Sequence, residues 1–198
     1  MSTKNDAVAP LALDGYEVLV CVCGGIAAYK VAGVVSALAQ RGAGVTVAMT
    51  ESATRLVAPM TFQALSGRRV LTTMWEEGSD TDVRHIRVTE SADLVLIAPA
   101  TANMIGKMVG GIADDLVSTL VISAASPVVV VPAMNERMWA NPIVASNVAV
   151  LKQHGYVLVG PAEGWLACRG FGPGRMAEPE DILEAVVSML KNTEPKNV

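Results

Sequence analysis

The sequence is poor in aromatic and charged residues. Aromatic residues make up 4% and charged residues 17% of the 198 residues. The Lys and Arg residues are scattered, with Arg68 and Arg69 as the largest cluster, and the formal net charge is −4. Nucleic-acid binding requires a basic stripe and often aromatic platforms for bases. We therefore expect no nucleic-acid partner.

Cysteine is also scarce, and its placement excludes a disulfide scaffold. Of the three cysteines, Cys21 and Cys23 are too close for an ordinary bridge, and the third is Cys168. An odd number with this spacing favours a reducing compartment, so we expect a cytoplasmic protein. No Cys and His residues have the spacing of a zinc site, which predicts that no metal is bound.

The sequence has no clear targeting or membrane-spanning segment. Residues 1–15 lack a basic start followed by an apolar run, and we interpret them as a flexible leader. The uncharged stretch 116–135 has the length of a membrane span. Because it contains Ser, Thr and Pro, we interpret it as a buried helix followed by a buried strand. We expect no membrane partner.

What the sequence has is a regular alternation of apolar segments. Hydrophobic residues make up 52% of the chain, enough for one domain over residues 16–190, followed by a tail over 191–198. Valine-rich runs without polar alternation predict strands, and segments with helical spacing lie between them. Strands are expected at 16–23, 44–49, 92–98, 128–131 and 156–159, with a short one at 70–73; helices are expected at 26–40, 52–57, 59–65, 102–109, 114–125, 142–154 and 180–190. This order predicts an α/β fold, a doubly wound, Rossmann or flavodoxin-like, mostly parallel sheet with helices on both faces.

Glycine and polar residues follow several of the expected strands, where such sheets bind ligands. Gly24 and Gly25 would let the backbone approach a phosphate at a helix N-terminus, although a plain tight turn explains them equally well. Thr50 and Ser52 could add hydroxyl groups to the same site, and Ser52 is as plausible as a helix cap. Asn135 follows another strand and is either a cap or a polar ligand-binding group.

Two further residues have the character of reactive groups. The glycine-rich segment 165–178 is expected to be a long loop, a lid or a disordered segment. It contains Cys168 beside arginines, the one cysteine placed like a reactive thiol, whereas Cys21 and Cys23 are expected in the core. His85 follows a charged segment and fits a surface residue as well as a catalytic one.

Six segments, in this order, resemble the homo-oligomeric flavin-containing cysteine decarboxylases. They are GGIAAYK (24–30), MTESA (49–53), His85-Ile86, APATAN (98–103), PAMNERMW (132–139) and ACRGFGPGRMAEP (167–179). The resemblance covers residues 16–190, and it is greatest to the phosphopantothenoylcysteine decarboxylases of coenzyme A biosynthesis. The last two segments are the specific ones, because the glycine turn alone is shared with many nucleotide-binding proteins.

The resemblance implies an FMN cofactor, a set of site residues and a homo-oligomer, either a trimer or a dodecamer of trimers. It implies FMN contacts from Gly24, Gly25, Ile26, Thr50, Ser52, Ala100, Thr101, Asn103 and Ser118. The implied catalytic residues are His85, Asn135 and Cys168, and the implied substrate contacts are Asn135, Met138, Ala167, Arg175 and Met176. A neighbouring subunit would complete the flavin site.

The chemistry that the resemblance implies is an oxidative decarboxylation of a cysteine carboxylate. Hydride transfer from the β-carbon to FMN makes a thioaldehyde, loss of carbon dioxide leaves an ene-thiol, and the reduced flavin restores the saturated thiol. Cys168 would donate the proton in that last step. His85 would be a general base or an orienting group, and Asn135 would hold the substrate carboxylate by its amide N–H.

Departures from the family pattern leave alternatives open. Related proteins commonly read Ala-Cys-Gly-Asp where this chain has Arg169 and Gly170 after its cysteine. Many bacterial relatives are fused to a ligase domain, so this chain is either a stand-alone enzyme or a fragment. A peptidyl-cysteine decarboxylase is the nearest alternative, and a non-catalytic flavin-binding or regulatory relative is the other.

Overall fold

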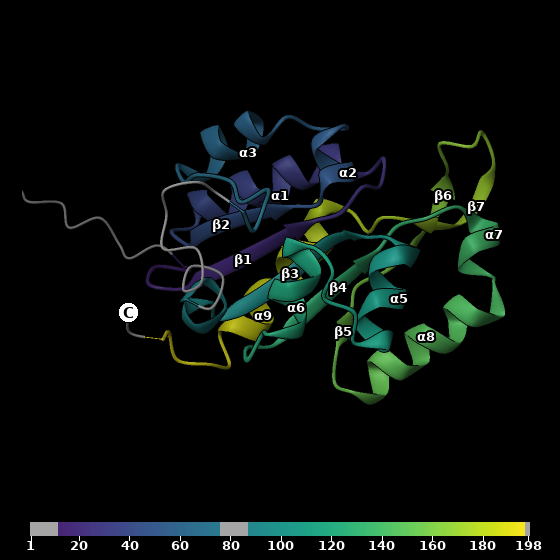
Figure 1. The fold of residues 1–198 in the computed structure, drawn as a ribbon. Helices are drawn as coiled ribbons and strands as arrows, with labels where there is room; N and C mark the ends of the chain where they lie inside the picture. Colours follow the sequence, from purple (N-terminus) through teal and green to yellow (C-terminus); the bar gives the residue numbers. More distant parts are fainter. Residues whose placement is uncertain (1–11, 76–86, 197–198) are drawn as a thin grey trace, which may run out of the picture.

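The computed structural model describes residues 12–75 and 87–196 (Figure 1). Its main sheet has five parallel strands in the order β2-β1-β3-β4-β5. These are β1 (Glu17–Val22), β2 (Gly44–Met49), β3 (Leu94–Ala100), β4 (Val128–Pro132) and β5 (Val157–Leu158). This is the strand order of flavodoxin-like folds, and the predicted fold class is confirmed.

Helices cover both faces of the sheet. Three of them pack on one face, namely α1 (Ala28–Gln40), α3 (Pro59–Ser66) and α9 (Pro179–Leu190). The other face carries α5 (Ala102–Gly110), α6 (Leu116–Ile122) and α8 (Pro142–Gln153). Short helices at α2 (Glu51–Thr54), α7 (Glu136–Trp139) and residues 87–91 complete the described helices. The result is a three-layer arrangement with two apolar cores.

Strand β1 shows why both faces must be covered. Val18, Val20 and Val22 belong to the core beneath α1, whereas Cys21 and Cys23 belong to the core beneath α5 and α6. Side chains alternate across a strand, so a run of apolar residues supplies both layers. The expected core position of the two cysteines is confirmed. Burial raises the pKa of Cys23 to about 12, which keeps the thiol neutral and unreactive.

The uncharged stretch 116–135 divides as the sequence predicts. Its first part is α6, which is buried except near its carboxyl end, and its second part is the buried strand β4. The helix begins later than expected because Asp115 caps it: the Ser118 N–H donates to Asp115 Oδ1 at 2.7 Å, and the Asp115 N–H donates to Ser118 Oγ at 3.0 Å. Within the described residues, no helix is long and apolar enough to span a membrane.

The structure differs from the sequence prediction in two segments. In place of the strand expected at 70–73, the structure has a single β-bridge between Leu71 and Ala48 of β2. Where a loop was expected over 165–178, strands β6 (Ala162–Trp165) and β7 (Phe171–Arg175) form an antiparallel hairpin. The strand β7 was not predicted because it contains glycine and proline, which are rare in strands. In the turn of the hairpin, the Leu166 N–H donates to the Gly170 carbonyl at 2.8 Å.

The turn between β1 and α1 yields a stability prediction. A Cβ at Gly24 would lie 2.3 Å from the Ser52 Cβ, whereas a Cβ at Gly33, exposed on α1, would meet nothing within 4 Å. We expect Gly24→Ala to lower the free energy of unfolding by about 1–3 kcal/mol through overpacking. The matched change Gly33→Ala should raise it by about 1 kcal/mol through helix propensity. Urea unfolding followed by circular dichroism measures both, and a stabilised Gly24→Ala variant would contradict the close packing.

Candidate functional site

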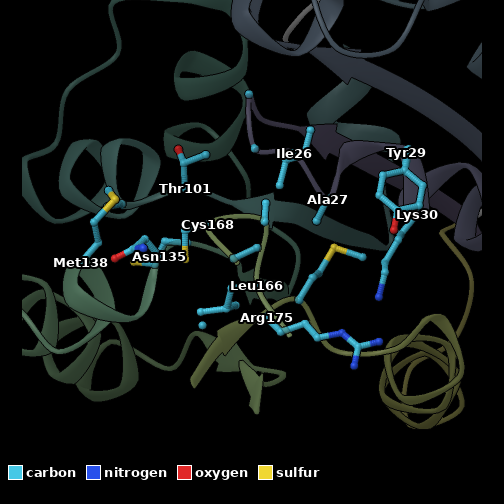
Figure 2. Close-up of a pocket in the computed structure, with 18 of the residues that line it drawn as sticks. Ile26, Ala27, Tyr29, Lys30, Thr101, Asn135, Met138, Leu166, Cys168 and Arg175 are labelled. Carbon is cyan, nitrogen blue, oxygen red and sulfur yellow. The ribbon is translucent and has the colours of Figure 1, made fainter. Parts of the chain in front are cut away.

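A cavity of about 730 Å³ opens at the carboxyl ends of β1, β3 and β4 (Figure 2). It is lined by the turn after β1, the start of α5, the segment after β4 and the β6–β7 hairpin. The chain leaves β1 toward one face of the sheet and β3 toward the other, which makes this the topological switch point of the fold. The volume lies in the range of cofactor sites.

The structure brings together residues from four of the segments singled out in the sequence. The predicted site residues that line the cavity are Gly24, Gly25, Ile26, Thr101, Asn135, Met138, Ala167, Cys168, Arg175 and Met176. They lie far apart in the chain, and the parallel strand ends and the hairpin unite them. Ile26 and Met138 are exposed apolar side chains there, at 63% and 47%. Exposed apolar surface around a hollow is typical of a binding site.

The amino end of α1 faces the cavity and favours an anion. Its N-cap, Ala27, makes no side-chain capping bond, and its first turn has no acidic residue. Ala27, Tyr29 and Lys30 of this turn line the cavity. The N–H groups of Ala28 and Lys30 donate to the Gly25 and Ala27 carbonyls, so this turn can offer a phosphate the positive end of the helix dipole and its other N–H groups.

Asn135 is both a helix cap and a cavity residue. Its Oδ1 accepts a hydrogen bond from the Arg137 backbone N–H at 2.8 Å, which caps α7. The expectation of a capping asparagine is confirmed. Because Oδ1 is used by the cap, the Nδ2 amino group is the end of the side chain left to donate to a ligand.

The hairpin carries Cys168 at its turn and is fastened to the segment that holds Asn135 (Figure 1). The Met134 N–H donates to the Gly174 carbonyl at 2.9 Å. Gly174 has a φ of +126°, and a Cβ there would lie 2.3 Å from the Met134 carbonyl oxygen, so glycine is required at this contact. Cys168 is exposed, unlike the two buried cysteines. An exposed thiol is thus held at the cavity by a docked hairpin.

An ion-pair network lies at the other side of the cavity. The Glu178 carboxylate accepts hydrogen bonds from Lys30 Nζ through Oε2, at 3.1 Å, and from the Arg175 guanidinium through Oε1. The Lys30 hydrogen bond, followed by the charges of both cations, lowers the pKa of Glu178 and keeps it ionised. Lys30 and Arg175 both line the cavity. The network joins α1, β7 and the start of α9.

Several predicted residues do not line this cavity, and their roles stay predictions. Thr50 caps α2 by accepting from the Ala53 N–H at 3.2 Å, so Ser52 is not the cap. Ser118 is 1% exposed and is used in the Asp115 capping box. The residues outside the cavity lining are Thr50, Ser52, Ala100, Asn103 and Ser118. His85 lies outside the described residues.

The sequence analysis missed part of the lining. The missed residues are Ala27, Tyr29, Lys30, Ala102, Ala133, Met134, Trp165, Leu166 and Gly174. Lys30 could have been found, because it follows Ile26 by four residues and so shares its face of the helical segment. Among the described residues, no group of His, Cys, Asp and Glu could hold a metal ion.

Comparisons with known proteins agree with this geometry. The Flavoprotein family model matches residues 8–191. The chain is 49% identical over 172 residues to the coenzyme A biosynthesis bifunctional protein CoaBC of Bacillus subtilis (strain 168), a match that covers 87% of this chain and 42% of that protein. The chain therefore spans less than half the length of that relative.

Two solved structures share the fold. One is a Cys-to-Ser variant of PPC decarboxylase complexed with pantothenoylaminoethenethiol, with a TM-score of 0.78, 29% identity and coverage of 89% of this chain and 98% of the other. The second is SpaF, described as an FMN-dependent cysteine decarboxylase, with a TM-score of 0.78, 32% identity and coverage of 89% and 96%. Because the family model matches nearly the whole length of the chain, this protein belongs to the Flavoprotein family.

Proposed function

We propose that this protein is an FMN-dependent carboxy-lyase that converts phosphopantothenoylcysteine to phosphopantetheine and carbon dioxide in coenzyme A biosynthesis. The observation that carries the proposal is the cavity at the β1–β3 switch point, where a docked hairpin holds the exposed Cys168 near the Asn135 segment. The similarity to CoaBC and to PPC decarboxylase supports this choice of substrate.

The cavity residues fit FMN. The start of α1, which has no side-chain cap and no acidic residue in its first turn, offers the positive end of its dipole to the phosphate, and Ile26 and Met138 offer apolar contacts for the ring system. When bound, FMN would take a hydride from the substrate β-carbon and return it after carbon dioxide has left. The known protein SpaF is described as FMN-dependent, which supports this cofactor.

The chain's own residues would orient the substrate and move a proton. Asn135 would donate an Nδ2 hydrogen bond to the substrate carboxylate, in an orientation that its capping bond fixes. Cys168 would give a proton to the ene-thiol left after decarboxylation. The ligand of the PPC decarboxylase variant is by its name an ene-thiol, which supports such an intermediate. His85 stays a predicted general base or orienting group.

We infer that the protein acts as a cytoplasmic homo-oligomer, a trimer or a dodecamer of trimers, in which residues 16–190 form one domain. Large apolar side chains exposed outside the cavity, such as Trp75 at 82% and Met60 at 67%, support an interface with a second copy. Light scattering of the FMN-bound protein measures the mass, and a monomer would contradict this inference.

The proposed function predicts a coloured, active protein. We expect the purified chain to bind FMN and, once loaded, to release carbon dioxide from phosphopantothenoylcysteine. Visible absorption measures the flavin, and mass spectrometry identifies phosphopantetheine as the product. A peptide with a C-terminal cysteine serves as the comparison substrate, and faster turnover of that peptide would favour a peptidyl-cysteine decarboxylase. An FMN-loaded protein that decarboxylates neither substrate would favour a non-catalytic flavin-binding protein and refute the proposal.

Replacement of Cys168 should separate the two halves of the reaction. We expect Cys168→Ser to keep FMN binding and carbon dioxide release, because these steps do not need the thiol. The return to the saturated thiol should fall by about 100-fold or more, since a hydroxyl is a far weaker acid than a thiol. Single-turnover absorbance should then show persistent reduced flavin, and mass spectrometry an unsaturated product.

The variant Cys168→Ala is the control for the shape of the side chain, and it should stall at the same step. Formation of the saturated product by Cys168→Ser at the wild-type rate would show that Cys168 is only a turn residue of the hairpin.

A further inference from the structure

The cavity has a reacting side and a cationic side. Figure 2 shows Asn135, Met138 and Cys168 on one side, and Lys30 and Arg175 on the other. Among the described residues of the lining, Lys30 and Arg175 carry the only ionised side chains. They come from α1 and β7, so the fold has brought two cations to one place in an otherwise uncharged cavity.

The two cations are held in position but keep unused hydrogen-bond donors. Each one is bonded to a different oxygen of the Glu178 carboxylate. An ammonium group has three N–H donors and a guanidinium group has five, so one bond to Glu178 leaves most of them for a ligand. Arg175 also packs on Gly164, where a Cβ would lie 2.9 Å from Nη1. The cations are therefore pre-organised rather than free to swing.

The charge of this cluster suits a phosphate. One carboxylate neutralises one of the two cations, which leaves a net positive charge beside the cavity. A guanidinium and an ammonium group on one oxyanion form charge-assisted hydrogen bonds, the usual way in which proteins bind phosphate. The Lys30 side chain is only 16% exposed, so solvent screens this charge less than at an open surface.

We propose that Lys30 and Arg175, positioned by Glu178, bind the phosphate of the substrate and so make the enzyme selective for phosphorylated over unphosphorylated cysteine substrates. This inference rests on the proposed function. In phosphopantothenoylcysteine, the phosphate and the reacting cysteine are at opposite ends of an extended molecule. With the cysteine at Asn135 and Cys168, the phosphate would lie toward the other side of the cavity, where Figure 2 shows Lys30 and Arg175. The phosphate of FMN is assigned instead to the uncapped start of α1.

The test compares two substrates that differ only in the phosphate. For FMN-loaded wild type, Lys30→Gln and Arg175→Gln, kcat/KM for carbon dioxide release is measured with phosphopantothenoylcysteine and with pantothenoylcysteine. We expect each substitution to reduce the phosphorylated-to-unphosphorylated ratio by about 10- to 100-fold, because a charge-assisted contact is lost.

A matched control removes a positive charge elsewhere. Lys152, an exposed residue in the last turn of α8, lies outside the cavity lining, and Lys152→Gln should leave the ratio unchanged.

Glu178→Gln keeps both cations but weakens the hydrogen bonds that hold them, so it should raise the KM for the phosphorylated substrate several-fold with little change in kcat. An equal loss on both substrates in the Lys30 and Arg175 variants would show that the network only holds the fold together.

A binding measurement separates this inference from the proposed function. Calorimetry of the FMN-bound protein with phosphopantothenate and pantothenate, which lack the reacting cysteine, reports phosphate recognition without turnover. We expect the wild type to prefer phosphopantothenate and the two variants to lose that preference. The inference is overturned if the wild type shows no preference, or if either variant releases FMN while it keeps the phosphate preference, because the cations would then bind the phosphate of FMN.

Discussion

The pairing of β1 with β3 is the constraint on which the site depends. These two strands lie side by side in parallel, yet their connections leave toward opposite faces of the sheet. No helix can then cover the space above both strand ends, and a hollow is left there. Valine and cysteine side chains that are 0–2% exposed anchor β1 in both cores, so the strand cannot shift its register without exposing them. The hollow is thus a consequence of how the cores are built.

The hairpin adds functional groups to that hollow, because its residues Cys168 and Arg175 line the cavity. The Gly174 carbonyl of the hairpin accepts a hydrogen bond from the backbone N–H of Met134, the residue before Asn135. The hairpin that carries Cys168 is therefore bonded to the segment that carries Asn135, and both residues line the cavity. Arg169 in the hairpin turn has a φ of +64°, a conformation that costs a side-chain-bearing residue free energy. Two hydrogen bonds within the turn, from the Leu166 N–H to the Gly170 carbonyl and from the Arg169 N–H to the Leu166 carbonyl, counter that cost. The geometry of the cavity comes from backbone packing as much as from side chains.

The cavity lining has few charged side chains, and they lie on one side of it. Lys30 and Arg175 share the Glu178 carboxylate on one side, while the other side is lined by neutral groups. A molecule with a phosphate at one end and the reacting cysteine at the other would bind such a cavity in one direction only. The same network ties α1 to β7 and α9, so recognition of the ligand and attachment of the hairpin use the same residues.

The sequence by itself determined the alternation of strands and helices, the two-sided burial of β1 and the exposed character of Cys168, because local periodicity and composition reflect burial directly. It also pointed to the strand-end residues Gly24 and Asn135. Only the tertiary structure decided that the glycine-rich segment is a hairpin and that Lys30 meets Arg175 through Glu178, because these depend on contacts between residues far apart in the chain. It likewise decided that the Thr50 hydroxyl caps α2 and that the Ser118 hydroxyl accepts from the N–H of the cap residue Asp115, since hydroxyl groups suit such bonds and ligand sites equally and only their neighbours distinguish the two.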